Sequence, residues 1–294
     1  MKALKYESTF ENDRDYATIE VFPTISNLLY TMDNREHNTY MRGEDSSETG
    51  STDFTGTKSW EESVNLMRNG WDKYVQEIKQ KSNKGVKGGD KYAFVKKAKP
   101  YNSIVGFLPN VPNAILNIPE SMITKDFVPQ KRKTLNIEYF MSGSCGESQE
   151  FFKNAGIALV TAINIIEKAN VQVKLNVYCF SGQVNGSGNK THSTFCGVTI
   201  KNYGERFDLQ KICFPLIHPS FLRRIGFKYL ETTPLIKSSG WSWGYGKPIY
   251  DVEELKRVIK PEKNVYILST GWIKNHNNNV EEILKYLGFK TTIK

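Results

Sequence analysis

The feature that most constrains the fold is a strand, a turn, a helix and a second strand that follow one another between residues 134 and 180. Apolar and polar residues alternate over the first strand, which ends near Met141, and a Ser/Gly-rich turn follows at 142–146. A strongly apolar stretch from about 149 to 168 predicts the helix, and alternation resumes from Val171. Because apolar residues cover most of the helix circumference, we expect this helix to be central.

Regular elements continue towards the end of the sequence. A glycine-rich loop at 182–188 leads to a third predicted strand at 194–201. Asp251 and Glu254 cap a predicted helix, a buried strand follows at 265–268, and Gly288 closes a last helix. Alternation of strands and helices favours an α/β fold, with helices on the faces of a sheet, over residues 134–294.

The sequence predicts an acidic arm or extended segment over residues 1–57. Residues 1–62 carry 6 Lys and Arg against 13 Asp and Glu, and the remaining residues carry 34 against 18. The segment has apolar residues that need burial, but too many polar residues interrupt them for a separate core. We expect it to pack on the basic body of its own chain or of a neighbouring chain, and the second arrangement would make an oligomer.

Residues 58–133 predict a helix, a lysine-rich linker and a proline-rich connection, so the part before residue 134 is expected to be α/β or irregular. Ser59 and Glu62 form a capping box, and an apolar stripe runs from Val64 to Ile78 with Gly70 inside it. Eight lysines and one acidic residue lie between 79 and 100, which predicts a mobile basic linker or loop. Four prolines between 109 and 129 predict turns and extended pieces.

The turn at Ser142, Gly143 and Ser144 leaves the end of a strand and opens a helix, where open α/β sheets bind ligands. It resembles the Asp-x-Ser-Gly-Ser metal-binding loop of von Willebrand factor A-like domains, a resemblance that covers residues 134–290 and implies von Willebrand A-like, Rossmann-like layering. The family's aspartate is replaced by Phe140, and the late strand ends in Leu-Ser-Thr-Gly at 268–271 without an acid. Because hard cations need anionic oxygens, we expect a hydrogen-bonded turn and no metal or other cofactor.

Other candidate catalytic sites lack partners. His192 and Cys196 lie four positions apart on one face of a predicted strand, with no third ligand nearby. The sequence contains no Walker, nucleophile-elbow or HExxH motif. We therefore expect a protein that is not an enzyme. A divergent metal-dependent or hydrolytic enzyme that uses Ser142 and Ser144 is an alternative.

Aromatic residues interleave with glycines before residue 250. Since Trp and Tyr often anchor interfaces, the candidate partner-binding residues are Trp241, Trp243, Tyr245 and Lys247. The same pattern is typical of an aromatic loop folded onto a core. Aromatic side chains can also stack on single-stranded nucleic acid while lysines contact phosphates. The lysines that would do so are Lys91, Lys96, Lys97 and Lys99.

A segment near residue 60 resembles a signature of a widespread family of tailed-phage proteins of unassigned function. It reads DFTGTKSWEE at 53–62 and continues to NGW at 69–71, and residues 111–122 and 142–168 also fit. Ser63 and Asn117 depart from the family pattern, which has Ala and Gly there. In size, acidic arm and lack of catalytic motifs, the chain is also similar to phage anti-defence proteins of the Gabija type, which bind a host nuclease–helicase complex.

The function expected first is a phage-encoded, non-enzymatic inhibitor that binds a host defence complex in the host cytoplasm. We expect it to form a homo-oligomer whose acidic arms help to hold the subunits together. A nucleic-acid-binding protein of phage replication or packaging is the alternative that the lysine-rich segment favours. No run approaches the roughly 18 to 20 apolar residues of a membrane span, so we expect no membrane association.

Overall fold

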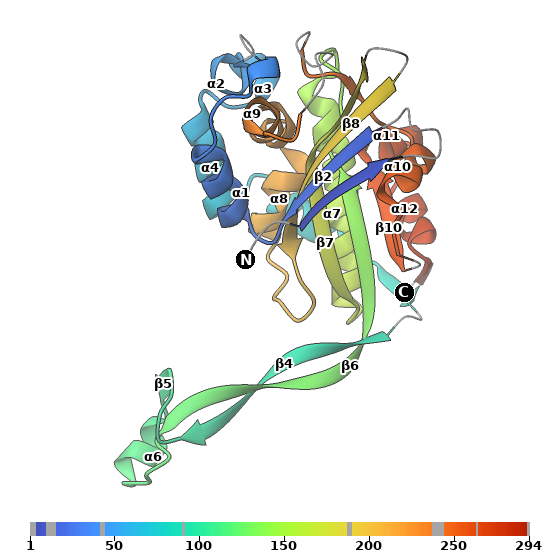
Figure 1. Ribbon diagram of the computed structural model, residues 1–294. Coiled ribbons are helices and arrows are strands. Elements are labelled where there is room, and N and C mark those ends of the chain that lie inside the picture. Colours follow the sequence, from blue (N-terminus) through green and yellow to red (C-terminus); the bar gives the residue numbers. More distant parts are fainter. Residues whose placement is uncertain are drawn as a thin grey trace.

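The computed structural model describes residues 4–9, 16–41, 45–89, 92–186, 190–236, 244–262 and 264–292. These residues form a body built around a mixed β-sheet and a long two-stranded arm that projects from the body (Figure 1).

The body sheet has the strand order β1–β2–β8–β7–β6–β10. Strand β6 lies parallel to both β7 and β10, whereas β8 lies antiparallel to β7 and parallel to β2. The bounds of these strands are β1 (Leu4–Thr9), β2 (Tyr16–Phe22), β6 (Met122–Phe140), β7 (Gln172–Gly186), β8 (Lys190–Lys201) and β10 (Val265–Ser269). Short strands complete the sheets: β3 (Gly85–Gly88) with β11 (Phe289–Thr292), and β9 (Lys247–Pro248) with β7.

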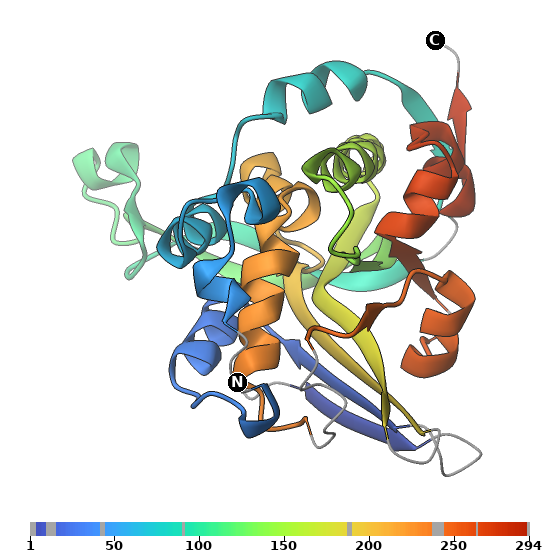
Figure 2. The same cartoon turned by 90° about the horizontal axis from the view of Figure 1, so that it is seen from above.

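Helices cover both faces of the sheet. The expected central helix is α7 (Gln149–Lys168), with 14 of its 20 residues buried. It packs against α8 (Leu209–Ile217), and Gly156 allows this close approach because a Cβ there would lie 2.2 Å from the Leu216 carbonyl oxygen. Helix α10 (Val252–Ile259) covers the opposite face (Figure 2). The layered α/β fold predicted for the second half is therefore confirmed.

The remaining helices of the body lie on the α7 side of the sheet. They are α1 (Ile25–Asp33), η1 (Thr39–Met41), α2 (Ser46–Thr49), α3 (Thr52–Thr55), α4 (Trp60–Asn69), α5 (Val75–Lys81), η2 (Phe221–Gly226), α9 (Phe227–Thr232), α11 (Thr270–Asn275) and α12 (Val280–Tyr286). Their buried side chains join those of α7 in the larger of two hydrophobic cores.

The N-terminal segment lies against the body of its own chain. Strand β2 adds to the body sheet beside β8, and Leu28 and Leu29 of α1 are buried in the main core. The described part of residues 1–57, expected to form an arm or extended segment, thus consists of two antiparallel strands, β1 and β2, followed by short helices that pack on the body. The apolar side chains of this segment, which cannot form a core of their own, are buried against the body.

Arg224 holds this segment in place. Its guanidinium is fully buried and uses all five N–H groups: Nε donates to Thr57 Oγ1 at 2.7 Å, and Nη1 and Nη2 donate to four carbonyl oxygens between 2.8 and 3.0 Å. Those carbonyls belong to Ser47, Glu48, Gly50 and Thr57. A loop whose carbonyls are buried needs such donors, so Arg224 fixes the course of residues 47–57.

The adjacent Arg223 and Glu231 add to this attachment. Arg223 Nη1 donates to the Phe54 carbonyl oxygen at 2.7 Å, and its guanidinium carbon lies 4.1 Å from the Phe54 ring centroid. Buried Glu231 accepts from the Ser47 N–H at 3.1 Å and from the Ser47 hydroxyl. The DFTGTKSWEE segment is therefore, in the structure, largely a docking element for the body.

The predicted helix cap at Ser59 is present, but the Glu62 carboxylate accepts from the Lys58 N–H at 2.6 Å and not from the Ser59 N–H of a full capping box. The helix is also shorter than its apolar stripe. Ser59 Oγ accepts from the Glu62 N–H at 3.2 Å at the start of α4. Gly70 has φ +88° and ends α4, and the Trp71 N–H then donates to the Gln210 carbonyl oxygen. The stripe continues in a second helix, α5, because the chain turns at this glycine.

The arm is built from the region predicted to be a linker and a connection. Strand β4 (Tyr92–Ser103) pairs antiparallel with the first part of β6, so that Tyr92 faces Lys133 and Ser103 faces Met122. Strand β5 (Leu108–Pro109) and helix α6 (Val111–Ile115) form its tip. The second part of β6, from Thr134, lies in the body sheet. One strand of 19 residues, about 60 Å long, thus belongs to both parts.

Replacing Arg224 by Met should lower the free energy of unfolding by about 3 kcal/mol, because buried carbonyl oxygens lose their donors. Urea unfolding followed by circular dichroism measures this. Arg206→Met, at an exposed arginine, is the control and should change stability by less than about 0.5 kcal/mol. Equal stability of the two variants would show that Arg224 does not hold the segment.

His218 should make stability depend on pH. Burial lowers the pKa of His218 to about 4 from its ordinary 6.5, so the unfolded chain binds a proton at a higher pH than the folded chain does. Stability from this group is complete above about pH 6.5 and is lost as the pH falls towards 4, by about 3 kcal/mol in total. The difference in unfolding free energy between the unmodified protein and His218→Gln should shrink by that amount from pH 7.5 to pH 4. Parallel curves would contradict this assignment.

Candidate functional site

The tip of the arm carries an exposed apolar surface. Nine large apolar side chains between residues 101 and 118 are exposed, whereas only two others, Tyr30 and Tyr40, are exposed elsewhere in the described part of the chain. The nine are Tyr101, Ile104, Val105, Phe107, Leu108, Val111, Ile115, Leu116 and Ile118. Apolar surface gathered in this way is typical of an interaction site.

Backbone hydrogen bonds order the tip without covering its side chains. The Phe107 N–H donates to the Ile123 carbonyl oxygen at 3.0 Å, and the Asn110 N–H donates to the Ser121 carbonyl oxygen at 2.7 Å. At Gly106, in the turn between β4 and β5, a Cβ would lie 2.2 Å from the Ile123 carbonyl oxygen, so only glycine allows this turn to approach β6 so closely. The apolar surface is therefore preformed.

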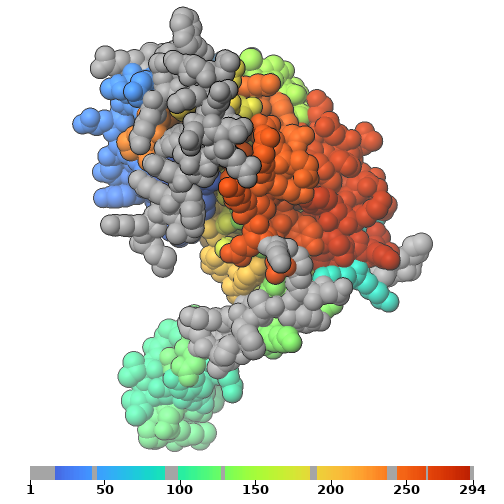
Figure 3. Space-filling model, turned by 45° about the vertical axis from the view of Figure 1, so that its right-hand side comes forward, coloured from blue at the N-terminus to red at the C-terminus, as the bar shows by residue number. Residues whose placement is uncertain are grey.

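Charge separates the tip from the shaft of the arm. Residues 100–124 contain one charged residue, Glu120. The sequence on either side of the tip, residues 91–99 and 125–133, contains eight Lys and Arg against one Asp. The arm thus combines an apolar, nearly uncharged tip with a shaft whose sequence is rich in basic residues. Figures 1 and 3 show that the tip lies at the far end of the arm, away from the body.

A second candidate site is a pocket of about 480 Å³ at the other end of β6, which we call the sheet-edge pocket. The turn at 142–145 after β6 forms one wall, and β7 and η2 form others. Its polar lining comprises Ser46, Ser142, Ser144, Cys145, Ser181 and Arg223, and its apolar lining comprises Phe54, Phe180, Leu222, Phe227, Tyr245 and Pro248. The pocket lies at the carboxyl end of β6, whose neighbours in the sheet are β7 and β10. Open α/β sheets usually bind ligands at the carboxyl ends of their strands.

The turn is fixed by hydrogen bonds from neighbouring elements. The Ser142 N–H donates to Thr270 Oγ1 at 3.3 Å, and the Ser144 N–H donates to Tyr250 Oη at 2.6 Å. Arg223 Nη2 donates to the carbonyl oxygens of Ser144 and Glu147. Burial lowers the pKa of Arg223 to about 10, so the guanidinium still carries its charge near neutral pH.

The residues of this turn do not fit a divalent cation. Phe140 stands at the aspartate position, and its ring is buried against Tyr178 and Phe195. None of the residues that line the pocket is acidic, and the Arg223 guanidinium would repel a metal ion. Across the described ranges, no group of three or more His, Cys, Asp or Glu is arranged to hold a metal ion.

Only part of the predicted aromatic loop can be placed. Trp241 and Trp243 lie outside the described residues. The Tyr245 ring stacks on Phe227 with centroids 3.7 Å apart, and its hydroxyl donates to Glu231 Oε1 at 2.6 Å, so it belongs to the pocket wall. Lys247 is exposed on β9 beside β7. The structure thereby brings Tyr245 and the Ser142–Ser144 turn, far apart in sequence, to one pocket.

The lysines proposed for nucleic acid lie on or next to β4. Lys96 and Lys97 are residues of this strand, and Lys99 is exposed near the tip. Lys91 lies outside the described residues. The pairing of β4 with β6 brings a second group of basic residues to the shaft, which the sequence alone did not indicate. Lys131, Arg132 and Lys133 of β6 lie opposite residues 92–94 of β4.

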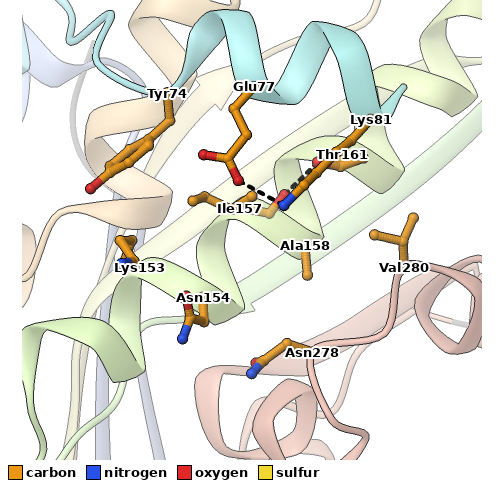
Figure 4. Close-up of a pocket in the computed structure, with 10 residues that line it drawn as sticks. All are labelled: Tyr74, Glu77, Lys81, Lys153, Asn154, Ile157, Ala158, Thr161, Asn278 and Val280. Atoms are coloured by element: carbon orange, nitrogen blue, oxygen red, sulfur yellow. Dashed lines mark hydrogen bonds and ion pairs between the residues drawn. The ribbon is translucent and has the colours of Figure 1, made fainter. Parts of the chain in front are cut away.

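Two other regions hold less for a ligand. A pocket of about 290 Å³ between α5 and α7 has polar groups that bind one another, including the ion pair Lys81–Glu77 at 2.6 Å and the hydrogen bond from Thr161 to Ile157 (Figure 4). Cys196, predicted beside His192, is fully buried, and burial raises its pKa well above the ordinary value. This thiol is unsuited to nucleophilic attack.

Comparison with known proteins identifies one family. A family described as a domain of unknown function, DUF7192, matches residues 11–291. No curated protein and no solved structure matches the chain. In the part of the chain that the structure describes, no helix has the length and apolarity needed to cross a membrane.

Proposed function

The chain belongs to the DUF7192 family, and we propose that it acts as a non-enzymatic binding protein that inserts the tip of its arm into another protein. The observation that carries this proposal is the concentration of exposed apolar side chains at the tip. Burying them on a partner would recover roughly 25 cal/mol per Å² of apolar surface, and the preformed tip loses little entropy on binding.

The charge of the arm indicates the kind of partner. An apolar tip on a basic shaft is complementary to a partner surface with an apolar groove and an acidic rim. A partner of the same chain would bring a second basic shaft close to the first, and this would cost free energy. We therefore propose a different protein as the occupant.

The resemblance to tailed-phage proteins and to Gabija anti-defence proteins supports a more specific form of this proposal. The chain would then be a phage-encoded inhibitor that reaches a host nuclease–helicase complex in the host cytoplasm. A von Willebrand A-like body would serve as the scaffold that carries the arm and the turn at Ser142.

Two charges on the tip should abolish partner binding. Val105 and Ile115 are 77% and 73% exposed, so Val105→Glu with Ile115→Glu should leave the fold intact. We expect binding to weaken at least about 30-fold, because central apolar anchors dominate such interfaces. Capture from host lysate, identification of the captured protein by mass spectrometry and affinity measurement with that purified protein test this.

Tyr30→Glu is the matched control, because Tyr30 is a 70% exposed aromatic residue on the body. Its binding should equal that of the unmodified chain. Light scattering tests whether the tip instead binds a second copy of the chain, and vesicle binding tests whether it binds a lipid surface. A multimer that the tip variant dissociates, or binding to anionic vesicles that the variant loses, would overturn a protein partner of different sequence.

The basic shaft favours nucleic-acid binding as a second candidate function. If it binds single-stranded nucleic acid, affinity should fall with salt, with a log–log slope of roughly −0.7 per phosphate contact. Replacing Lys91, Lys96, Lys97 and Lys99 by Gln should then reduce the slope by about 3. Four Lys→Gln changes on the body, at Lys58, Lys211, Lys285 and Lys290, should not. Binding that is absent at low salt, or equal slopes, would exclude the shaft.

A further inference from the structure

We infer that the sheet-edge pocket binds a small molecule that bears an oxyanion, a carboxylate or a phosphate, on a flat apolar group. The pocket lies on the body at the carboxyl end of β6. Figure 1 shows that the arm is formed by the opposite end of this strand, so the pocket is separate from the proposed protein-binding tip.

Two buried hydroxyl groups in the pocket have no hydrogen-bond partner. Ser142 is 1% exposed and Ser181 is 4% exposed, and neither Oγ atom makes a hydrogen bond in the structure. They come from different elements, the turn after β6 and strand β7. A buried hydroxyl normally has a partner, so a ligand with accepting oxygens would satisfy both.

Arg223 supplies a positive charge without a carboxylate to neutralise it. It is 2% exposed, and its hydrogen bonds go to the carbonyl oxygens of Phe54, Ser144 and Glu147. The nearby Glu147 carboxylate instead lies 3.7 Å from Lys274 Nζ. Because none of the described residues that line the pocket is acidic and Arg223 is cationic, the described lining carries a net positive charge, which favours an anion over a cation.

The rest of the lining determines the other half of the ligand. Phe180, Leu222 and the Phe227 ring form apolar walls. A volume of about 480 Å³ is in the range of pockets that take small molecules. Apolar walls beside a single charged group favour a ligand with one anionic end and one flat apolar end.

Cys145 gives a direct measurement of occupancy. Its thiol lines the pocket and is exposed, whereas the other three cysteines are buried. Alkylation by neutral iodoacetamide, followed by mass spectrometry, should therefore add one label to the folded protein. Saturating benzoate or phenyl phosphate should slow this reaction at least fivefold, and the neutral analogue benzamide should not. Cys145→Ser, which should remain unlabelled, confirms the site of reaction.

Removing the two hydroxyls tests whether the pocket recognises the anion. Ser142→Ala with Ser181→Ala leaves the hydrogen bonds of Arg223 in place, and it should weaken binding of the protecting anion about tenfold in calorimetry. Ser121→Ala, on the arm, is the control and should bind as the unmodified protein does. Arg223 itself is left intact because it also holds the Phe54 segment.

The outcomes separate the site from its alternatives. Equal protection by benzamide, or undiminished affinity in the double serine variant, would overturn oxyanion recognition. Protection by none of the three compounds, or binding of Mg²⁺ or Mn²⁺ at this turn, would overturn it as well. None of these outcomes affects the proposal for the tip, because the tip variants are tested separately by partner capture.

Discussion

The buried guanidinium of Arg224 is the interaction on which the arrangement of the body depends. A charged group that is removed from water must find an acceptor for each N–H, and Arg224 finds all five on residues 47–57. Those residues gain the donors that their buried carbonyl oxygens need. The N-terminal segment, whose charge is opposite to that of the rest of the chain, becomes in this way part of the wall of the sheet-edge pocket, through Ser46 and Phe54.

Strand β6 links the two candidate sites. Its first part forms the arm with β4, its second part lies between β7 and β10 in the body sheet, and its end leads into the turn at Ser142. Hydrogen bonds to β7 and β10 hold the second part firmly, which gives the arm a rigid base. The apolar tip and the pocket are therefore built on one element but lie at its opposite ends, so a partner at the tip leaves the pocket accessible.

The turn at Ser142 shows how position and chemistry can diverge. It lies where open α/β sheets bind ligands, and this much follows from its place after a strand and before a helix. A bulky aromatic residue at 140 and a buried arginine at 223 replace the acidic surroundings that a metal ion needs. Arg223 comes from a helix about 80 residues later in the chain, so no local motif announces it.

Sequence alone determined the elements whose signals are local. The alternation at 135–141, the apolar run of α7 and the cap at Ser59 each depend on neighbouring residues, and each has its counterpart in the structure. The four prolines between 109 and 129 predicted only turns and extended pieces in this region. Only the tertiary structure decided that residues 101–118 form an exposed tip and that Arg224 donates its hydrogen bonds to carbonyl oxygens of residues 47–57. It also decided that Tyr245 and Ser142 line one pocket. Each of these features depends on contacts between segments that are far apart in the sequence. The pattern of residues along the chain does not specify which distant segments come into contact.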